Sequence, residues 1–358
     1  MEGKRFMPDD KVKIGFVGVG SMGQCAHLKN YVIIPECTVV AIAEIREKMA
    51  KRVAEKYGIP HVYSSYEKML KEQKIDGLVV SQPFTRHGVL IPELLKYGIP
   101  IFTEKPLAGT IEMGKKIIAV LKKSGTWHMV GYHKRSDPAS MYVKKEVDRL
   151  KETGELGNLR YIRILMPAGD WIAGGFNDLI KGEELPANLE FDPPDKEMDK
   201  DTYNVYLSFV NYYIHQVNLL RYFLGESYDV TYADPSGILL VGKSRSGVTC
   251  VIEMTPYRTT IDWQESVLIA FERGYIRLEL PAPLASCRAG RVVLFRDRGN
   301  GETPETIIPQ FPWIHAMMQQ AINFVQAIKG KVKPMCEAAE ALEDLEVARQ
   351  YIRLLKGK

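Results

Sequence analysis

Three glycines near the start of the chain have the spacing of a phosphate-binding turn. Gly18, Gly20 and Gly23 match the pattern G-x-G-x-x-G. In this pattern the first glycine permits a tight turn, the second lets the backbone approach a pyrophosphate, and the third lets a helix pack closely on the preceding strand. The pyrophosphate lies at the helix N-terminus, where unpaired N–H groups and the helix dipole favour an anion. The spacing therefore predicts a dinucleotide site; the alternative is a structural turn without a ligand.

An acidic residue follows at the distance expected for a ribose contact. Glu44 ends a second apolar stretch, 38–43, and lies 21 residues beyond Gly23, where a carboxylate accepts hydrogen bonds from the adenine ribose. A 2′-phosphate at about 4 Å would be repelled by about 4 kcal/mol at an effective dielectric constant near ~20. Arg46 could accommodate a phosphate if Glu44 turned away. We therefore expect the cofactor NAD rather than NADP.

A lysine in the loop Glu104-Lys105-Pro106 is a further candidate for chemistry. It follows an apolar stretch, so we expect it at the carboxyl end of a strand. Its ammonium group can hydrogen-bond a substrate hydroxyl and lower the cost of removing the hydroxyl proton. Glu104 could hold the lysine in place, and Pro106 would make the turn rigid. The alternative is an ordinary solvated Glu–Lys pair.

A repeating pattern of strands and helices positions these residues. Short apolar runs bounded by turn residues predict strands, and helical periodicity predicts helices between them. Repeated βα units predict a parallel, doubly wound sheet, in which ligands bind beyond the carboxyl ends of the strands. The predicted strands are 12–17, 38–43, 61–63, 76–81, 99–103 and 126–131, and the predicted helices are 21–31, 46–57, 65–73, 86–97 and 110–123.

The pattern changes after Gly131, where strands follow one another without helices between them. This predicts an α/β fold with an N-terminal Rossmann domain (1–133) and a C-terminal α+β domain (134–358) that has a large, mostly antiparallel open sheet. The last helices could pack back on the first domain. The predicted helices are 137–152, 203–224, 314–329 and 337–355, the predicted strands are 159–166, 228–233, 237–242, 247–254, 265–272, 274–280 and 291–296, and 167–201 is irregular.

An open sheet of this kind needs cover on both faces. We therefore expect a homo-oligomer, a dimer or a tetramer, that packs through the C-terminal sheet.

The composition argues against several other classes of protein. The chain has 358 residues, 46% hydrophobic and 26% charged, and a net charge of +4, which is too small to favour nucleic acid. Five scattered cysteines without C-x-x-C predict reduced thiols rather than disulfides or a zinc site. The charged N-terminus lacks the apolar core of a signal peptide, and no apolar run approaches the roughly 18 residues of a membrane span. We expect a cytoplasmic protein without a metal or a membrane partner.

In three motifs the chain resembles the glucose–fructose oxidoreductase / inositol dehydrogenase / MocA family. The motifs are Gly18-x-Gly20-x-x-Gly23, Thr103-Glu104-Lys105-Pro106 and the stretch 131–135, and the resemblance covers nearly the whole chain. It implies a Rossmann domain, a C-terminal α/β domain and a tightly held nicotinamide cofactor. It also implies oxidation or reduction of a sugar, a polyol or a related hydroxyl compound, and Lys105 matches the active-site lysine of the family.

The resemblance also points to a pair of residues on the predicted helix 203–224. The family has an Asp followed four residues later by a His, and the matching residues here are Asn211 and His215. A spacing of four places both on one helix face. His215 matches the catalytic base of the family, and an imidazole can accept the hydroxyl proton near neutral pH; the alternative is a buried structural histidine. Asn211 departs from the family and adds no negative charge beside His215.

The remaining candidate residues line the cofactor or the substrate. Ser21 and Met22 lie in the glycine turn, and the loop after the fourth main strand resembles the T-P-x-x-x-H loop of the family, although a packing role is favoured for His87. For the substrate residues, core packing or a place at the domain junction is the alternative. The cofactor candidates in that loop are Ser81, Gln82, Pro83 and His87, and Glu104 and Lys105 are further cofactor candidates. The substrate candidates are Tyr132, Lys134, Arg163, Asp170 and Trp171.

These observations predict an NAD-dependent oxidoreductase that acts on a secondary hydroxyl of a sugar, cyclitol or glycoside. Lys105 would polarise the hydroxyl, His215 would act as general base, and Asn211 would position the hydroxyl. One alternative is an NAD-dependent glycosidase or lyase that uses transient oxidation and elimination. The other alternative is a non-catalytic protein that senses the dinucleotide.

Overall fold

The computed structural model describes residues 11–186 and 188–357, so most of the charged N-terminal segment lies outside the described residues. The chain forms two compact units. The first contains the chain up to Gly131, together with Gly175–Asp195 and Gln320–Leu342. The second contains Tyr132–Gly174, Lys196–Gln319 and the chain from Glu343 onward. Among the helices of the described residues, none is long and apolar enough for a membrane crossing.

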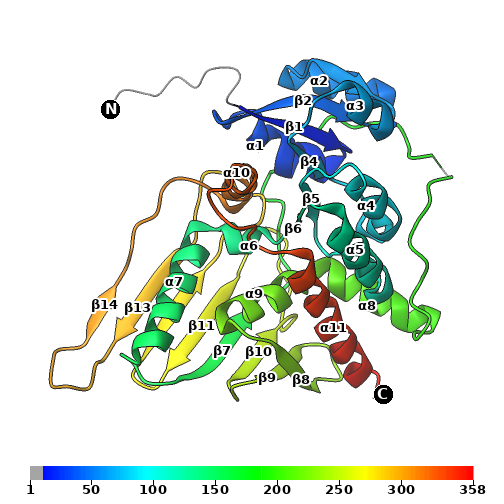
Figure 1. Cartoon of the computed structure of the whole chain (residues 1–358). Coiled ribbons are helices and arrows are strands. Elements are labelled where there is room, and N and C mark those ends of the chain that lie inside the picture. Colours follow the sequence, from blue (N-terminus) through cyan, green and yellow to red (C-terminus); the bar gives the residue numbers. More distant parts are fainter. Residues whose placement is uncertain (1–10, 187, 358) are drawn as a thin grey trace, which may run out of the picture. The chain divides into compact units, whose positions relative to one another are not determined.

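Six parallel strands form the sheet of the first unit in the order β3-β2-β1-β4-β5-β6 (Figure 1). Strand β1 pairs with β2 on one side and β4 on the other, so the glycine turn opens at the centre of the sheet. Strands β4 and β5 are buried along their whole length, as expected for strands covered on both faces. The strands are β1 (Val12–Val17), β2 (Cys37–Ala43), β3 (His61–Tyr63), β4 (Gly77–Val80), β5 (Ile101–Glu104) and β6 (His128–Gly131).

The helices between these strands confirm the predicted doubly wound arrangement. Thr110 caps the last of them by accepting a hydrogen bond from the Met113 N–H, and Gly125 ends it in the left-handed conformation. The predicted helix 21–31 contains a π-helical segment, which its sequence pattern does not indicate. The helical segments are η2 (Gly23–Leu28), α1 (Lys29–Tyr31), α2 (Glu47–Tyr57), α3 (Tyr66–Glu72), η3 (Phe84–Arg86), α4 (His87–Leu95) and α5 (Ile111–Ser124).

The first unit is completed by residues from the end of the chain. Helix α10 (Ala316–Ile328) carries Phe324, which is fully buried. The ring of Phe324 packs against Tyr31, Phe102 and Trp127, with centroid separations of 6.5, 5.7 and 5.5 Å. Burial of one such ring stabilises a fold by about 1.5–3 kcal/mol.

The second unit contains an eight-stranded sheet in the order β14-β13-β12-β11-β7-β10-β9-β8 (Figure 1). Only the β7–β10 pair is parallel among its pairings, so the predicted mostly antiparallel sheet is confirmed. Strand β14 was not predicted. The strands are β7 (Leu159–Leu165), β8 (Tyr228–Ala233), β9 (Leu239–Ser244), β10 (Thr249–Glu253), β11 (Ser266–Phe271), β12 (Gly274–Glu279), β13 (Arg291–Arg296) and β14 (Glu305–Ile307).

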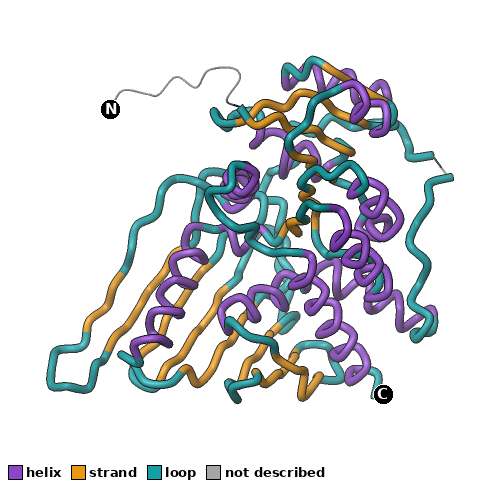
Figure 2. The backbone as a smooth tube through the Cα atoms, in the orientation of Figure 1, coloured by secondary structure: helices purple, strands orange, loops and turns teal. Residues whose placement is uncertain are grey.

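The helices of the second unit differ from the predicted ones at two places: the short helix α6 was not predicted, and one predicted helix is divided. The expected helix 203–224 is divided at Tyr213, which has φ −92° and ψ −3°. The Tyr213 hydroxyl donates to the Met254 carbonyl at 2.7 Å, and this tertiary contact holds the residue at the break. The helices are α6 (His133–Ser136), α7 (Pro138–Thr153), α8 (Lys200–Tyr212), α9 (Ile214–Leu224) and α11 (Ala338–Leu355); β7 and α8 are joined by a long loop without helix or strand (Figure 2).

A buried polar network joins α6, α9 and α11. The Arg135 Nε donates to Asn218 Oδ1 at 2.6 Å, and Asn218 Nδ2 donates to Asp344 Oδ2, also at 2.6 Å. Arg221 donates to Asp344 Oδ1 through Nε at 3.1 Å and Nη2 at 2.9 Å. Asp344 has no exposed surface. Because a buried charge is tolerated only with such partners, this network fixes α9, and with it His215, within the unit.

Asp137 precedes α7 and is also buried. Its carboxylate accepts hydrogen bonds from the Ala139 N–H at 2.8 Å and from the Gly290 N–H at 3.1 and 3.2 Å. Burial raises the pKa of Asp137 to about 6, and the charge of Glu265 acts in the same direction, although the backbone hydrogen bonds oppose both. The folded protein therefore holds a proton on Asp137 to a higher pH than the unfolded chain does.

Replacing Asp344 by Ala removes the carboxylate that neutralises Arg221 in the core. We expect the free energy of unfolding, measured by urea denaturation, to fall by about 3–5 kcal/mol. The neighbouring Glu343 lies half-buried and contacts Ser227, so Glu343→Ala is the matched control, with an expected loss of about 1 kcal/mol or less. Similar losses in both variants would contradict the importance of the network.

The raised pKa of Asp137 predicts a specific dependence of stability on pH. Between about pH 4 and pH 6 the folded state retains a proton that the unfolded chain has released, so the free energy of unfolding falls as the pH rises, by up to about 3 kcal/mol. Asp137→Asn cannot titrate and should lose this component. Urea denaturation of both proteins at pH 4, 5, 6 and 7 measures the difference. Parallel pH profiles would show that Asp137 titrates at an ordinary pKa.

Candidate functional site

The glycine turn after β1 has the geometry of a dinucleotide cradle. Gly18 has φ +91°, which side-chain-bearing residues rarely adopt. Its N–H donates to the Ala43 carbonyl at 2.8 Å, and a Cβ on Gly18 would lie 2.4 Å from the Ser81 carbonyl oxygen. A Cβ on Gly23 would lie 2.8 Å from the Gly18 carbonyl oxygen. Both positions therefore require glycine, as expected for the tight turn and the close helix packing of a dinucleotide-binding motif.

The two residues that follow the first glycine pair lie at the start of the helix. Ser21 is exposed and Met22 is half-buried, and the helix continues with the Gln24 N–H donating to the Gly20 carbonyl at 2.9 Å. Both predicted cofactor residues thus lie beside the cradle. Gly20 itself approaches Arg46, because a Cβ on Gly20 would lie 3.4 Å from Nη2 of that arginine.

Glu44 and Arg46 form a hydrogen-bonded ion pair beside this turn. Arg46 donates to the carboxylate through Nε and Nη2, each at 2.9 Å, and through its backbone N–H at 3.1 Å. The Val19 N–H donates to Glu44 Oε2 at 3.0 Å. Burial alone would raise the pKa of Glu44, but these hydrogen bonds and the charge of Arg46 hold the pKa below its ordinary value. The carboxylate is therefore ionised and linked directly to the glycine turn.

The loop after β4 also lies against the glycine turn. The Ser81 N–H donates to the Val17 carbonyl at 3.0 Å, and Gln82 accepts from Arg86 Nη1 at 2.8 Å. Pro83 precedes the turn η3. Ser81, Gln82 and Pro83 thus lie at the carboxyl edge of the sheet, as expected for residues that line a cofactor.

His87 is fully buried and supports the loop that carries Lys105. Its Nδ1 lies 3.2 Å from both the Pro106 and the Leu107 carbonyl oxygens. Burial lowers the pKa of His87 to about 4, although the backbone hydrogen bonds oppose this effect. His87 is therefore neutral near pH 7 and donates to one of these carbonyls through Nδ1–H. This contact supports the packing role that the sequence favours.

The loop at the end of β5 is fixed by a buried carboxylate. Glu104 Oε1 lies 2.6 Å from His27 Nε2, and Glu104 Oε2 accepts from the Lys105 N–H at 3.2 Å. Burial would raise the pKa of Glu104, but the hydrogen bond and charge of His27 and the charge of Lys105 hold it below its ordinary value. Glu104 thus holds the backbone of Lys105, whose side chain is half-buried.

The second unit brings His215 together with two residues of the 131–135 stretch. The rings of His133 and His215 meet edge-on with centroids 4.6 Å apart, and the Tyr132 ring lies 6.0 Å from that of His215. Because of the break at Tyr213, Asn211 lies in the last turn of α8 and His215 in the first turn of α9, so the pair does not share one uninterrupted helix. Asn211 is exposed and His215 half-buried.

Lys134 forms a buried ion pair. Its ammonium group contacts the Glu265 carboxylate and lies 5.3 Å from the centroid of the Trp263 ring. Gln216 Nε2 donates to the other oxygen of Glu265 at 2.8 Å. Burial lowers the pKa of Lys134, while Glu265 opposes this effect. Lys134 is thus held by protein groups next to α9, at the position where the sequence predicts a substrate residue.

The other predicted substrate residues lie elsewhere in the second unit. Arg163 lies in register with Val251 and Leu268 on the face of the sheet opposite to the buried Ile164, and its Nε is 3.2 Å from Glu253. Arg163 therefore does not join the His133–His215 pair. Asp170 Oδ1 accepts from the N–H groups of Ile172 and Ala173, each at 3.0 Å, and so closes its own loop. Trp171 accepts from the Leu284 N–H at 3.2 Å.

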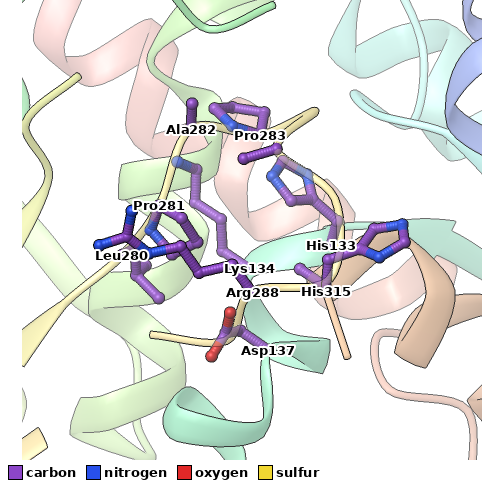
Figure 3. A pocket seen from close by; sticks show the side chains of 11 residues that line it. His133, Lys134, Asp137, Leu280, Pro281, Ala282, Pro283, Arg288 and His315 are labelled. Carbon is purple, nitrogen blue, oxygen red and sulfur yellow. The ribbon is translucent and has the colours of Figure 1, made fainter. Parts of the chain in front are cut away.

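A pocket in the second unit adjoins these residues (Figure 3). Its space is partly open to solvent and has room for about one water molecule. His133 lines it and also contacts His215, so the pocket adjoins the predicted catalytic histidine. Lys134, Asp137, Arg288 and His315 contribute the other titratable side chains, and the remaining lining residues are Leu280, Pro281, Ala282, Pro283, Ala285 and Ala316.

Several of these contacts were not predicted from the sequence. His27 lies 77 residues from Glu104, and Glu265 lies 131 residues from Lys134. No local pattern marks either partner. The only available signal was chemical, since Glu104 and Lys134 are charged residues beside apolar strands and need partners when buried. Within the described residues, no group of His, Cys, Asp and Glu side chains has the arrangement of a metal site.

The comparisons with known proteins agree with the geometry of the first unit. Residues 12–132 match the family described as "Oxidoreductase family, NAD-binding Rossmann fold" (GFO_IDH_MocA). An uncharacterized oxidoreductase, YrbE of Bacillus subtilis, is 24% identical over 68% of this chain and 64% of its own length. Myo-inositol 2-dehydrogenase of Thermotoga maritima is 24% identical over 67% of this chain and 64% of its own length. The matched part of the chain thus spans less than two thirds of either relative.

Solved structures share the whole fold. A putative NADPH-dependent oxidoreductase of Desulfitobacterium hafniense has a TM-score of 0.76 at 13% identity, covering 97% of this chain and 96% of the other. A putative myo-inositol dehydrogenase of Sinorhizobium meliloti has a TM-score of 0.69 at 19% identity, covering 97% and 98%. At these identities the likeness concerns the fold. Together with the glycine cradle, the match shows that residues 12–132 have the NAD-binding Rossmann fold of the Gfo/Idh/MocA oxidoreductases.

Proposed function

We propose that the protein is an NAD-dependent dehydrogenase that oxidises a secondary hydroxyl of a sugar, cyclitol or glycoside. The observation that carries this proposal is the fixed position of Lys105 at the carboxyl edge of the dinucleotide sheet, where His87 holds the carbonyls of its loop and Glu104 holds its N–H. The relatives named inositol dehydrogenases support the substrate class. A soluble, cytoplasmic enzyme is part of the same proposal.

The cofactor residues support NAD over NADP. Glu44 is ionised and buried at the end of β2, where it can accept from the ribose hydroxyls once Arg46 or Val19 releases one carboxylate oxygen. Arg46 is engaged with Glu44 and is not directed to a separate phosphate site. When bound, the nicotinamide accepts the hydride from the substrate carbon.

The protein residues would handle the proton of the substrate hydroxyl. Lys105 donates a hydrogen bond to the hydroxyl oxygen and stabilises the negative charge that develops there as the O–H bond weakens. His215 accepts the proton, while the C–H electron pair leaves as hydride. Asn211 would position the hydroxyl through its amide. Because Asn211 is neutral, it does not increase the basicity of His215 as an Asp would.

The sheet of the second unit supports a homo-oligomer. On the face opposite to the buried Ile162 and Ile164, the half-exposed Leu268 lies in register with Arg163, and Arg163 with Val251. A sheet face with apolar side chains on neighbouring strands needs cover. We propose that a second copy of the chain covers it.

Removal of either proposed catalytic group should abolish turnover without loss of cofactor. For Lys105→Ala and His215→Ala we expect kcat to fall by about 10²–10⁴-fold with unchanged NAD affinity, measured by NADH absorbance and by titration of protein fluorescence. The exposed Lys115 and His61 give the matched controls Lys115→Ala and His61→Ala, with full activity expected.

Activity measurements with several classes of substrate decide between this function and its alternatives. Free sugars, inositols and aryl glycosides are incubated with NAD and, separately, NADP. Accumulation of NADH with one substrate class supports the dehydrogenase and names its substrate. Aglycone release without net NADH would replace it by an oxidation-dependent glycosidase. Tight NAD binding without any turnover would instead favour a dinucleotide sensor.

A charge placed on the sheet face that carries Leu268, opposite to the buried Ile162 and Ile164, should separate the subunits. We expect Leu268→Lys to convert the oligomer into a monomer in size-exclusion chromatography with light scattering, because it places a third cation beside Arg163 and Arg277, which flank this position in the sheet. Lys123→Glu on the exposed surface of α5 is the control and should stay oligomeric. A monomeric unmodified protein would contradict the proposed interface.

A further inference from the structure

The segment Gly175–Asp195, called the strap here, belongs to the first unit although it lies between β7 and α8 in the sequence (Figure 2). Its described residues form neither helix nor strand. At its beginning, Asp178 forms an ion pair with Lys56 at 2.9 Å, and Ile180 exchanges two hydrogen bonds of 3.1 Å with the Gln24 side chain. Since Gln24 also donates to the Val19 carbonyl at 2.8 Å, the strap is tied to the glycine turn.

The other end of the strap is attached to the starts of two different helices. The Asp192 carboxylate accepts from the N–H groups of Gly88 and Val89 at 3.2 and 3.1 Å, and from that of Gly109 at 3.4 Å. Asp192 is buried. The strap is therefore held at both ends by contacts that do not involve its middle.

Between these attachments the strap follows α2 from its last turn to its first. The Lys181 carbonyl accepts from Arg52, and Gly182 packs so closely on Met49 that a Cβ would lie 2.5 Å from the Met49 Sδ. Glu183 then reaches the start of α2. Its Oε1 accepts from the Lys48 N–H at 3.1 Å, and its Oε2 accepts from the Met49 N–H at 3.3 Å.

The first N–H groups of a helix have no hydrogen-bond acceptor within the helix and are ordinarily free to bind another group. Arg46 precedes α2 and makes no side-chain capping hydrogen bond, so Glu183 supplies the cap from another part of the chain. Hydrogen bonds from its own N–H and from the N–H groups of Lys48 and Met49 hold the pKa of Glu183 below its ordinary value. The strap thus places a negative charge at the helix start next to the Glu44–Arg46 pair.

A 2′-phosphate on the adenine ribose is expected beside this helix start. In a Rossmann fold the acid at the end of the second strand marks the ribose 2′-hydroxyl, and a phosphate on that oxygen projects towards the following residues. Here those residues are Arg46 and Lys48, and the N–H groups of Lys48 and Met49 lie beside them at the start of α2. Without Glu183, the N–H groups of Lys48 and Met49 and the charge of Lys48 would favour an anion there, while Arg46 stays paired with Glu44.

We propose that Glu183 is a specificity-determining residue that excludes NADP by occupying the 2′-phosphate position with a carboxylate. The proposal rests on the proposed use of NAD and assigns the exclusion of NADP to the strap, in addition to Glu44. Glu183 hydrogen-bonds the N–H groups of Lys48 and Met49 at the start of α2 rather than the glycine turn, so its removal should change the affinity for NADP and leave that for NAD in place.

The test measures dissociation constants of NAD and NADP for the full chain by quenching of protein fluorescence. For Glu183→Ala we expect the NADP dissociation constant to fall by about tenfold or more, because a like charge is removed and two donors become available. Glu183→Gln removes the charge but keeps one acceptor oxygen for these N–H groups, and it should give a smaller gain. Glu184→Ala, a change at the exposed neighbour, should alter neither constant.

The outcomes separate this inference from the proposed function. An unchanged ratio of the two dissociation constants in Glu183→Ala, with NAD still bound, would overturn the role of Glu183 alone. Equal weakening of NAD and NADP would show that Glu183 merely anchors the strap, which also contradicts the proposal. Absence of binding of either cofactor to the unmodified protein would refute the proposed use of NAD and, with it, this inference.

Discussion

The first unit depends on the hydrogen bonds that the buried, ionised Glu104 carboxylate makes with two separate segments. The carboxylate binds His27 from the helix after the glycine turn and the N–H of Lys105 from the loop after β5. A buried charge of this kind is tolerated only when its partners stay in place. The same group therefore fixes the helix that covers the pyrophosphate position and the loop that carries the proposed catalytic lysine, so that neither can shift without exposing an unpaired charge.

Much of this arrangement could be predicted from the sequence because it is local. The apolar run 12–17 and the three glycines define a strand and a turn within a dozen residues, and the structure shows why: Gly18 has a positive φ and Gly23 touches the Gly18 carbonyl. The alternation of strands and helices up to Gly131 likewise follows from periodicity within each segment. The change to adjacent strands after that point was sufficient to predict the second sheet.

What could not be predicted is contact between distant segments. His27 with Glu104, Lys134 with Glu265 and Asn218 with Asp344 are separated by 77, 131 and 126 residues. The fold brings the two residues of each pair together, and no motif in the neighbouring sequence marks either residue as a partner. The division of the helix at Tyr213 likewise coincides with a contact to a distant segment, the hydrogen bond from the Tyr213 hydroxyl to the Met254 carbonyl. The strap, which has no regular structure, gave no periodic signal.

The discontinuity of the first unit has a consequence for synthesis of the chain on the ribosome. Phe324 fills a space between Tyr31, Phe102 and Trp127, and it is translated nearly two hundred residues after the last strand of that sheet. Until it emerges, the nascent Rossmann sheet presents an aromatic surface without its cover, and such surfaces favour association with other chains. Translation of the C-terminal part is therefore the step that ends the exposure, and a ribosome that pauses before Phe324 prolongs the interval in which chaperones must protect the N-terminal part.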